Sequence, residues 1–167
     1  MTLWTIAATL WVLLTGMGAV AATVYSNFDY GFAIVVPNGL AVERDQPPRP
    51  NHGFSVTLGQ GRRIFVFANY DVLQAGSAAA ALRQSLSYSH PDIEAPVRRT
   101  GLAGLPAAEA GVSAGASRGT RVGAFRTHDN RIAVIYEFYL DTDAAHARRD
   151  DTVFRQLLRG FTLQPLP

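Results

Sequence analysis

The chain has 167 residues, of which 48% are hydrophobic and 17% are charged, a composition typical of a globular domain rather than a disordered chain. It contains no cysteine, which excludes a disulfide framework, a thiolate zinc site and a thiol nucleophile. The formal net charge is +2, and its fifteen basic residues, all arginines, are interleaved with thirteen acids, so we expect no nucleic-acid partner.

The first 22 residues carry no charged side chain. An apolar run at residues 3–14 is followed by two glycines and then by the small residues of positions 19–22. This order is typical of a signal peptide cleaved after Ala21 or Ala22. We therefore expect a signal peptide over residues 1–22 and a single domain over residues 23–167, periplasmic or secreted. The alternative is an uncleaved anchor in the inner membrane, in which case residues 1–22 alone would contact the membrane.

The start of the mature chain predicts a short strand and a turn. Residues 32–36 alternate with Phe32, Ile34 and Val36 on one face, and the Pro-Asn-Gly that follows is typical of a turn. We expect residues 40–44 to return from this turn as a second strand. Residues 45–51 contain three prolines and are expected to form an exposed loop.

The next segments predict a hairpin and a helix. Residues 52–58 and 63–70 alternate on either side of a Gly-Gln-Gly turn, as the two strands of a hairpin do. Ser77 is expected to cap a helix over residues 78–88. Two further strands are expected at residues 93–100 and 105–113.

A second hairpin is predicted from residues 120–127 and 131–140, joined through residues 128–130. The later strand is apolar on both faces, which is typical of a central strand covered on both sides. Ten residues at about 3.3 Å each would cross a small domain. This strand is therefore expected at the middle of the sheet.

A second helix is predicted over residues 143–159. Its apolar stripe consists of Val153, Phe154, Leu157 and Leu158 and is continued by Phe161. Together the segments predict an α+β fold, with a single mainly antiparallel β-sheet and helices packed against it.

Three short motifs occur in order along the mature chain. Residues 31–40 read GFAIVVPNGL, residues 102–107 read LAGLPA, and residues 153–161 read VFRQLLRGF. They resemble the opening strand and turn, the mid-chain strand entry and the closing helix of PsbP-like domains. Leu40 stands where that family usually has tryptophan, and Gly160 stands where it has serine.

The resemblance implies a central antiparallel sheet with packed helices, in a family whose bacterial members are often exported or envelope proteins of unknown activity. The plant photosystem members are non-catalytic accessory subunits, and other members bind proteins. No catalytic residue comes with the resemblance. We therefore expect a non-enzymatic binding or accessory protein whose partner is another periplasmic or envelope protein. The alternatives are a carrier for a small apolar ligand, or a small hydrolase using His128, Asp129 and Glu137.

No catalytic, cofactor-binding or metal-binding motif occurs in the local context that its chemistry requires. Gly-x-Ser-x-Gly occurs at residues 111–115 and 115–119, but these residues lie at the end of one predicted strand and in the loop before the next, not at a strand-to-helix turn, so they do not form a nucleophile elbow. A Walker loop and a dinucleotide fingerprint are missing, and His146 and Asp150, at i, i+4, are a single helical pair and no metal site. We accordingly expect no catalytic residue, no cofactor and no metal.

Glu137 is the most informative polar residue, because a carboxylate inside an apolar strand needs a hydrogen-bond partner or access to water. With a two-residue hairpin loop it would lie opposite Val122 and share a face with Arg126. It would then either pair with an arginine or form the polar floor of a small pocket that Tyr139 also lines. His128, at the hairpin tip, is either a turn residue or a base. The candidate binding residues are Glu137, Tyr139, Arg126 and His128.

The signal peptide can be tested on the protein recovered from its host. N-terminal sequencing is expected to begin at Ala22 or Thr23, because the uncharged segment ends in small residues that fit signal-peptidase cleavage. An intact Met1 in the membrane fraction would instead support the uncleaved anchor.

Overall fold

The computed structural model describes residues 22–44, 52–92, 95–128 and 132–167. The described elements, in chain order, are β1 (Thr23–Asn27), β2 (Phe32–Val36), β3 (Val42–Arg44), β4 (Gly53–Gly59), β5 (Arg62–Tyr70), α1 (Ala78–Ser89), β6 (Arg98–Leu102), β7 (Leu105–Ala114), β8 (Ser117–His128), β9 (Ile132–Asp143), α2 (Ala147–Arg159) and β10 (Phe161–Leu163). Seven strands form a large sheet in the order β3-β4-β5-β9-β8-β7-β6, and three form a small sheet in the order β1-β2-β10. The described pairings are antiparallel, which confirms the predicted α+β class.

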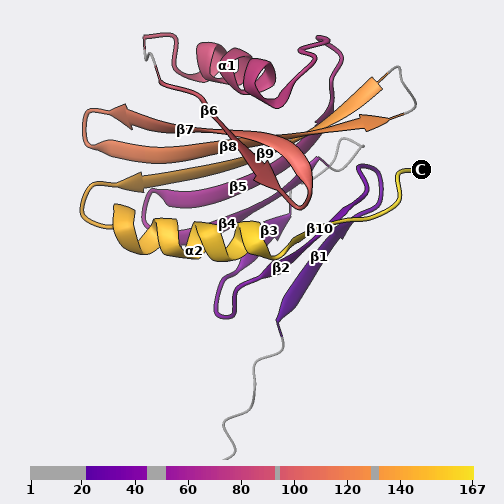
Figure 1. Cartoon of the computed structure of the whole chain (residues 1–167). Helices are drawn as coiled ribbons and strands as arrows, with labels where there is room; N and C mark the ends of the chain where they lie inside the picture. Colours follow the sequence, from indigo (N-terminus) through magenta and orange to yellow (C-terminus); the bar gives the residue numbers. More distant parts are fainter. Residues whose placement is uncertain (1–21, 45–51, 93–94, 129–131) are drawn as a thin grey trace, which may run out of the picture.

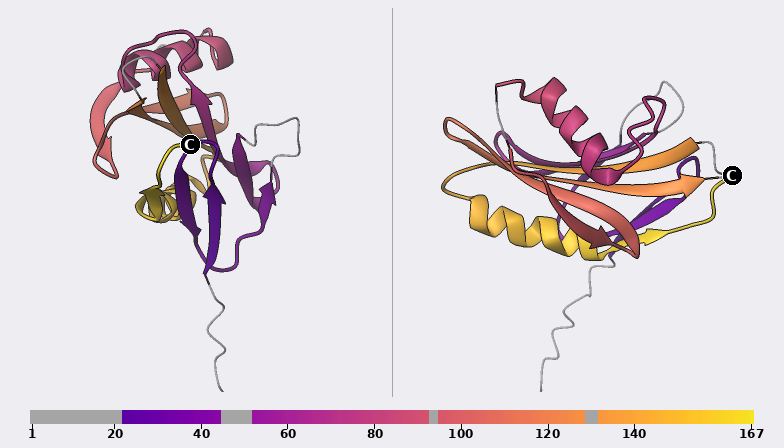
Figure 2. Two further views of the ribbon diagram at one scale, coloured as in Figure 1. Left: turned by 90° about the vertical axis from the view of Figure 1, so that its right-hand side faces the viewer. Right: turned by 45° about the horizontal axis from the view of Figure 1, so that its top comes forward.

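Strand β9 lies at the centre of the large sheet, between β5 and β8. Its even-numbered residues from Val134 to Leu140 are almost completely buried, whereas Ile135, Glu137 and Tyr139 point to the other face and are half-buried. Different elements cover the two faces: α2 and the small sheet lie on one side, and α1 lies on the other (Figures 1 and 2). The expected central position of this strand is confirmed, but its outer face is covered only in part, because α1 lies mainly over β7 and β8.

The main core lies between the large sheet, α2 and the small sheet. Helix α2 buries Phe154, Leu157 and Leu158, which confirms its predicted apolar stripe. Phe161 is not part of this helix but begins β10, because the chain turns at Gly160. A Cβ atom at Gly160 would lie only 2.6 Å from the carbonyl oxygen of Val35, so the close approach of the turn to β2 requires glycine.

Helix α1 covers the opposite face of the large sheet above β7 and β8. The side chain of Ser77 accepts a hydrogen bond from the backbone N–H of Ala80, which confirms Ser77 as the N-cap. Leu82 and Leu86 pack on small residues of β7, and no side chain stands between α1 and Gly123 of β8. These small residues let the helix lie close to this half of the sheet.

Two strand assignments made from the sequence are wrong. Strand β2 does not join the large sheet but pairs with β1 and β10. Residues 42–44 do not return along β2 but pair with β4 as β3. Alternation determines which side chains face the core, and that face is the same in either of two stacked sheets, so the pattern cannot identify the partner strand. The predicted loop at residues 45–51 lies outside the described residues.

The second helix begins four residues later than predicted, at Ala147. Strand β9 continues through Asp143, where it still pairs with Ser117 at the start of β8. The Asp143 carboxylate then accepts a hydrogen bond from the backbone N–H of His146 at 3.0 Å. This local turn occupies the residues that the sequence pattern had assigned to the first helical turn.

A buried ion pair connects α2 to the large sheet. Asp150, in the first turn of α2, is only 2% exposed. Nη1 of Arg62, at the start of β5, donates to both carboxylate oxygens of Asp150, at 2.9 and 2.7 Å. Thr142 of β9 donates a third hydrogen bond at 2.5 Å. Three elements thus meet at one carboxylate.

Replacing Asp150 by alanine is expected to lower the free energy of unfolding by about 3–5 kcal/mol, because the largely buried Arg62 guanidinium would lose both hydrogen bonds to Asp150. Among the described carboxylates it would keep only the more distant Asp143, 3.9 Å from its Nε. Urea denaturation followed by circular dichroism measures the loss. The matched control is Asp151→Ala, which removes only a half-exposed i, i+4 pair with Arg155 and is expected to cost about 0.5 kcal/mol or less. Equal losses for the two variants would show that the buried pair does not hold α2 to the sheet.

Candidate binding site between helix α1 and the sheet

A groove with a volume of about 680 Å³ runs between α1 and the outer face of β5 and β9. This volume falls within the range of roughly 300–1,000 Å³ that is typical of ligand pockets. The groove arises because α1 lies over β7 and β8 and leaves the neighbouring strands β5 and β9 only partly covered. Its walls are formed by Tyr30, His52, Asn69, Tyr70, Asp71, Val72, Leu73, Ala81, Gln84, Ser85, Tyr88, Ser89, Ile135, Glu137 and Tyr139.

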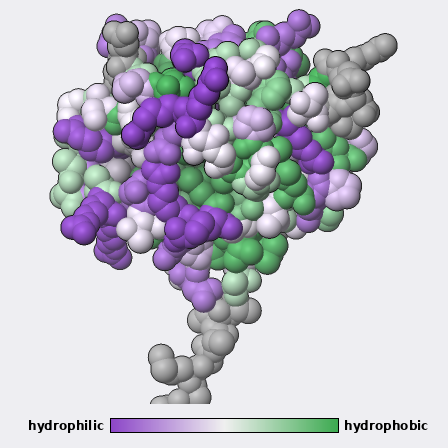
Figure 3. Space-filling view, in the orientation of Figure 1, coloured by the Kyte–Doolittle hydropathy of each residue, from purple (hydrophilic) through white to green (hydrophobic). Residues whose placement is uncertain are grey.

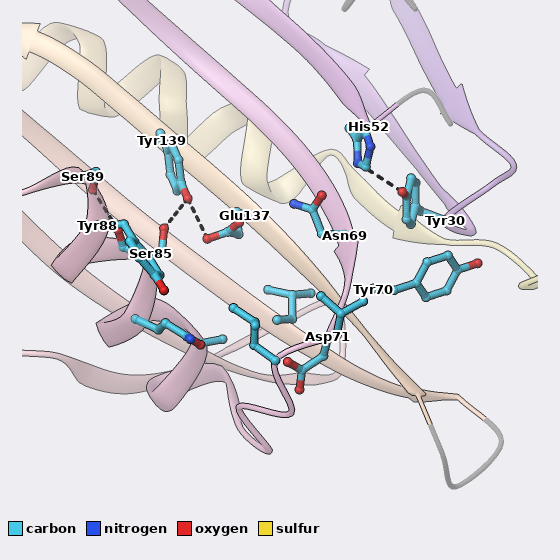
Figure 4. A pocket seen from close by; sticks show the side chains of 15 residues that line it. Tyr30, His52, Asn69, Tyr70, Asp71, Ser85, Tyr88, Ser89, Glu137 and Tyr139 are labelled. Atoms are coloured by element: carbon cyan, nitrogen blue, oxygen red, sulfur yellow. Dashed lines mark hydrogen bonds between the residues drawn. The ribbon is translucent and has the colours of Figure 1, made fainter. Parts of the chain in front are cut away.

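The polar floor of the groove is a chain of three side chains (Figure 4). The hydroxyl of Tyr139 donates to Oε1 of Glu137 at 2.6 Å. The Ser85 hydroxyl lies 2.6 Å from the same tyrosine oxygen. Because the single Tyr139 proton is directed at the carboxylate, Ser85 is the donor in the second hydrogen bond. This chain links α1 to β9 across the floor.

Tyr139 is held in its neutral form. Burial raises the pKa of its hydroxyl, and the adjacent negative charge of Glu137 raises the pKa further. The Arg121 guanidinium lies 4.7 Å from the centre of the Tyr139 ring, where its charge is matched by Asp141 at 2.6 Å. Tyr139 therefore acts as a fixed donor to Glu137.

Glu137 keeps one oxygen available to the groove. In the described part of the chain Glu137 forms no ion pair, and its hydrogen bond from Tyr139 involves Oε1. The side chain is half-buried beside the apolar wall that includes Ile135. A carboxylate in this position can accept hydrogen bonds from whatever fills the groove.

The rim of the groove is apolar and exposed. Val72 and Leu73, in the turn after β5, are 79% and 62% exposed, and Tyr88, near the end of α1, is 76% exposed. Asp71 holds this turn, because its carboxylate accepts hydrogen bonds from the backbone N–H groups of Ala75 at 2.9 Å and of the following glycine at 3.3 Å. The two aliphatic side chains are thus presented by a braced turn.

One end of the groove is closed by Tyr30 and His52. Nδ1 of His52 lies 3.0 Å from the carbonyl oxygen of Ala68, and since a carbonyl only accepts, this nitrogen carries the proton. The Tyr30 hydroxyl lies 3.1 Å from the same nitrogen, and its ring packs against Tyr70 at 5.2 Å between centroids. Burial raises the pKa of the Tyr30 hydroxyl. This end is aromatic and fixed.

The structure brings together two of the four predicted site residues. Glu137 and Tyr139 both line the groove, on the face of β9 that α1 partly covers. The expected register is wrong by one residue, because Glu137 lies opposite Gly123 rather than Val122. Arg126 consequently lies on the opposite face, where its guanidinium donates to the carbonyl oxygens of Gly31 and Gln164.

The fourth predicted residue, His128, ends β8 with its backbone opposite Ile132. That position is five residues along β9 from Glu137, or about 16 Å at 3.3 Å per residue. The side chain of His128, and Asp129 beside it, lie outside the described residues.

The sequence did not single out the groove residues on α1 or in the turn after β5. Tyr88 lies outside the apolar stripe of its helix, and Val72 and Leu73 follow the last alternating residue of β5. Within the described ranges no cluster of three or more possible metal ligands occurs, and no helix is both long and apolar enough to cross a membrane.

No family model and no curated protein matches this chain in sequence. Comparison of structures does find similar proteins. The cyanobacterial PsbP of Synechocystis sp. PCC 6803 (CyanoP) is 14% identical, with a TM-score of 0.58 over 89% of this chain and 95% of its own. LpqN of Mycobacterium tuberculosis, which is involved in cell envelope biogenesis, is 13% identical, with a TM-score of 0.59 over 87% of this chain and 91% of its own.

The Ran-binding protein Mog1p of Saccharomyces cerevisiae is also similar, at 11% identity and a TM-score of 0.50 over 86% of this chain and 95% of its own. At these identities the likeness concerns the fold alone. The antiparallel sheet and packed helices implied by the sequence motifs are therefore found in solved structures of the same kind, and the chain has a PsbP/Mog1-like fold.

Proposed function

We propose that this chain is an exported, non-enzymatic accessory protein that holds a segment of another envelope protein in the groove between α1 and the sheet. The main support for the proposal is the groove itself, which has an exposed apolar rim and the half-buried carboxylate of Glu137. The predicted signal peptide supports the location. LpqN's involvement in cell envelope biogenesis and Mog1p's binding of Ran support an accessory role.

A protein segment suits the groove better than a small molecule does. A small molecule inside the groove would leave the outward-facing surfaces of Val72, Leu73 and Tyr88 in water. A protein segment would cover both the floor and this rim. Exposed aromatic and aliphatic side chains around a pocket are typical of the residues that dominate protein interfaces.

A binding role also agrees with how the polar groups of the groove are used. The Ser85 hydroxyl donates to Tyr139 rather than facing a base, and the raised pKa of Tyr139 suits it to donate a hydrogen bond rather than to accept a proton. The backbone register gives the hydrolase alternative little support, because it separates His128 from Glu137 along β9.

The second candidate function is that of a carrier for a small apolar ligand. The volume of the groove, about 680 Å³, favours it, because a molecule of ordinary ligand size would fit between α1 and β9.

The accessory function is tested by affinity capture from envelope extract with three variants. Val72→Asp and Tyr88→Asp place a charge on the rim and are expected to weaken capture of the partner at least roughly tenfold, as loss of an interface anchor does. The control is Val24→Asp, on β1, because Val24 is also exposed at 57%. Apolar surface gathers over the region of the small sheet on the face drawn in Figure 3, so this control also tests a second apolar patch.

The outcomes separate the candidates. A partner that is retained by Val24→Asp and lost from both rim variants supports the accessory function. A partner lost only from Val24→Asp would place binding on the small sheet and contradict the proposed site. If native mass spectrometry finds a small molecule bound while capture yields no partner that depends on the rim, the carrier replaces the accessory function.

A further inference from the structure

We infer that the groove selects a segment carrying a positively charged side chain, arginine or lysine, flanked by apolar residues, with Glu137 as its counter-charge. This inference rests on the proposed function, because it specifies the chemistry of the bound segment.

The charges around the groove are unbalanced. Among the described residues that line it there are two carboxylates, Asp71 and Glu137, and no arginine. Both oxygens of Asp71 are engaged by backbone N–H groups of its own turn. The remaining negative charge that faces the groove is that of Glu137.

Nearby cations do not neutralise Glu137 in the described part of the chain. The guanidinium of Arg121 lies against the Tyr139 ring, and its hydrogen bonds go to Asp141, to the carbonyl oxygen of Leu140 and to Nε2 of His90. His52, at the closed end, carries its proton on the nitrogen that faces a backbone carbonyl. The carboxylate thus depends on Tyr139 and on water.

Filling the groove removes that water. A purely apolar segment would bury the free oxygen of Glu137 without a partner, and an unpaired buried charge is strongly unfavourable. A segment with a cationic side chain supplies both a donor and the opposite charge. The same carboxylate therefore opposes an apolar or acidic occupant and favours a basic one.

The walls suit the stem of a basic side chain. Arginine and lysine carry three or four methylene groups that pack on apolar surface while the charged end reaches a polar partner. The groove offers the ring of Tyr88 and the side chain of Ile135 for this packing. Apolar residues on either side of the basic one would cover Val72 and Leu73 at the rim.

The inference is tested with two blocked pentapeptides that differ only in the end group of the central side chain. Both have phenylalanine and leucine flanks; one has a central arginine and the other a central citrulline, which keeps the shape but lacks the charge. Titration of the isotope-labelled protein, in the form its host produces, is followed by NMR chemical shifts. The arginine peptide is expected to bind roughly tenfold more tightly, as a hydrogen bond to a charged group implies.

Glu137→Gln is expected to remove this preference while the citrulline peptide still binds. The matched control, Asp92→Asn, replaces an exposed carboxylate that does not line the groove and should leave the preference unchanged. Equal affinities for the two peptides, or a preference that survives in Glu137→Gln, would overturn the inference. Absence of binding by either peptide would also overturn it. The rim variants test the accessory function independently of the peptides. A negative peptide result would therefore not contradict the accessory function.

Discussion

The large sheet is apolar on both faces, and the rest of the structure depends on how each face is covered. Helix α2 and the small sheet cover the central part of the inner face, with Phe154 and Leu157 fully buried and the Arg62–Asp150 pair holding the helix in place. Helix α1 covers only the half of the outer face that lies over β7 and β8. The uncovered half leaves a half-buried carboxylate, aromatic walls and an apolar rim in one groove, so incomplete covering of the sheet creates the candidate site.

Elements whose hydrophobic periodicity reflects one buried face could be predicted from the sequence. Which strands pair with one another, and in which register, could not. The alternation of β5 and β9 and the apolar stripe of α2 each reflect one buried face, so the sequence located them closely. The position of β2 in a separate sheet depends on contacts with the preceding strand β1 and with β10, which is distant in sequence. The β8–β9 register depends on the length of one loop, and an error of one residue there moved Arg126 to the wrong face.

The candidate site was foreseen only in part. Glu137 and Tyr139 stood out because a carboxylate interrupts an apolar strand, which is a signal that a single sequence carries. Ser85 and Tyr88 gave no such signal, because their role depends on where α1 lies over the sheet. The small residues of β7 that allow this placement lie in a predicted strand but carry no signal for the helix that packs on them. Packing therefore makes the groove from residues that have no shared local pattern.

The most direct test of the groove as a binding site is cross-linking inside the host from a photo-reactive phenylalanine analogue placed at Tyr88, compared with the same analogue at Val24. If the groove holds a protein segment, the analogue at position 88 will cross-link to one envelope protein, within a segment that has a basic residue among apolar ones. The analogue at position 24 will not give that product. Equal products from both positions, or none from position 88, would contradict the assignment of the groove as the binding site.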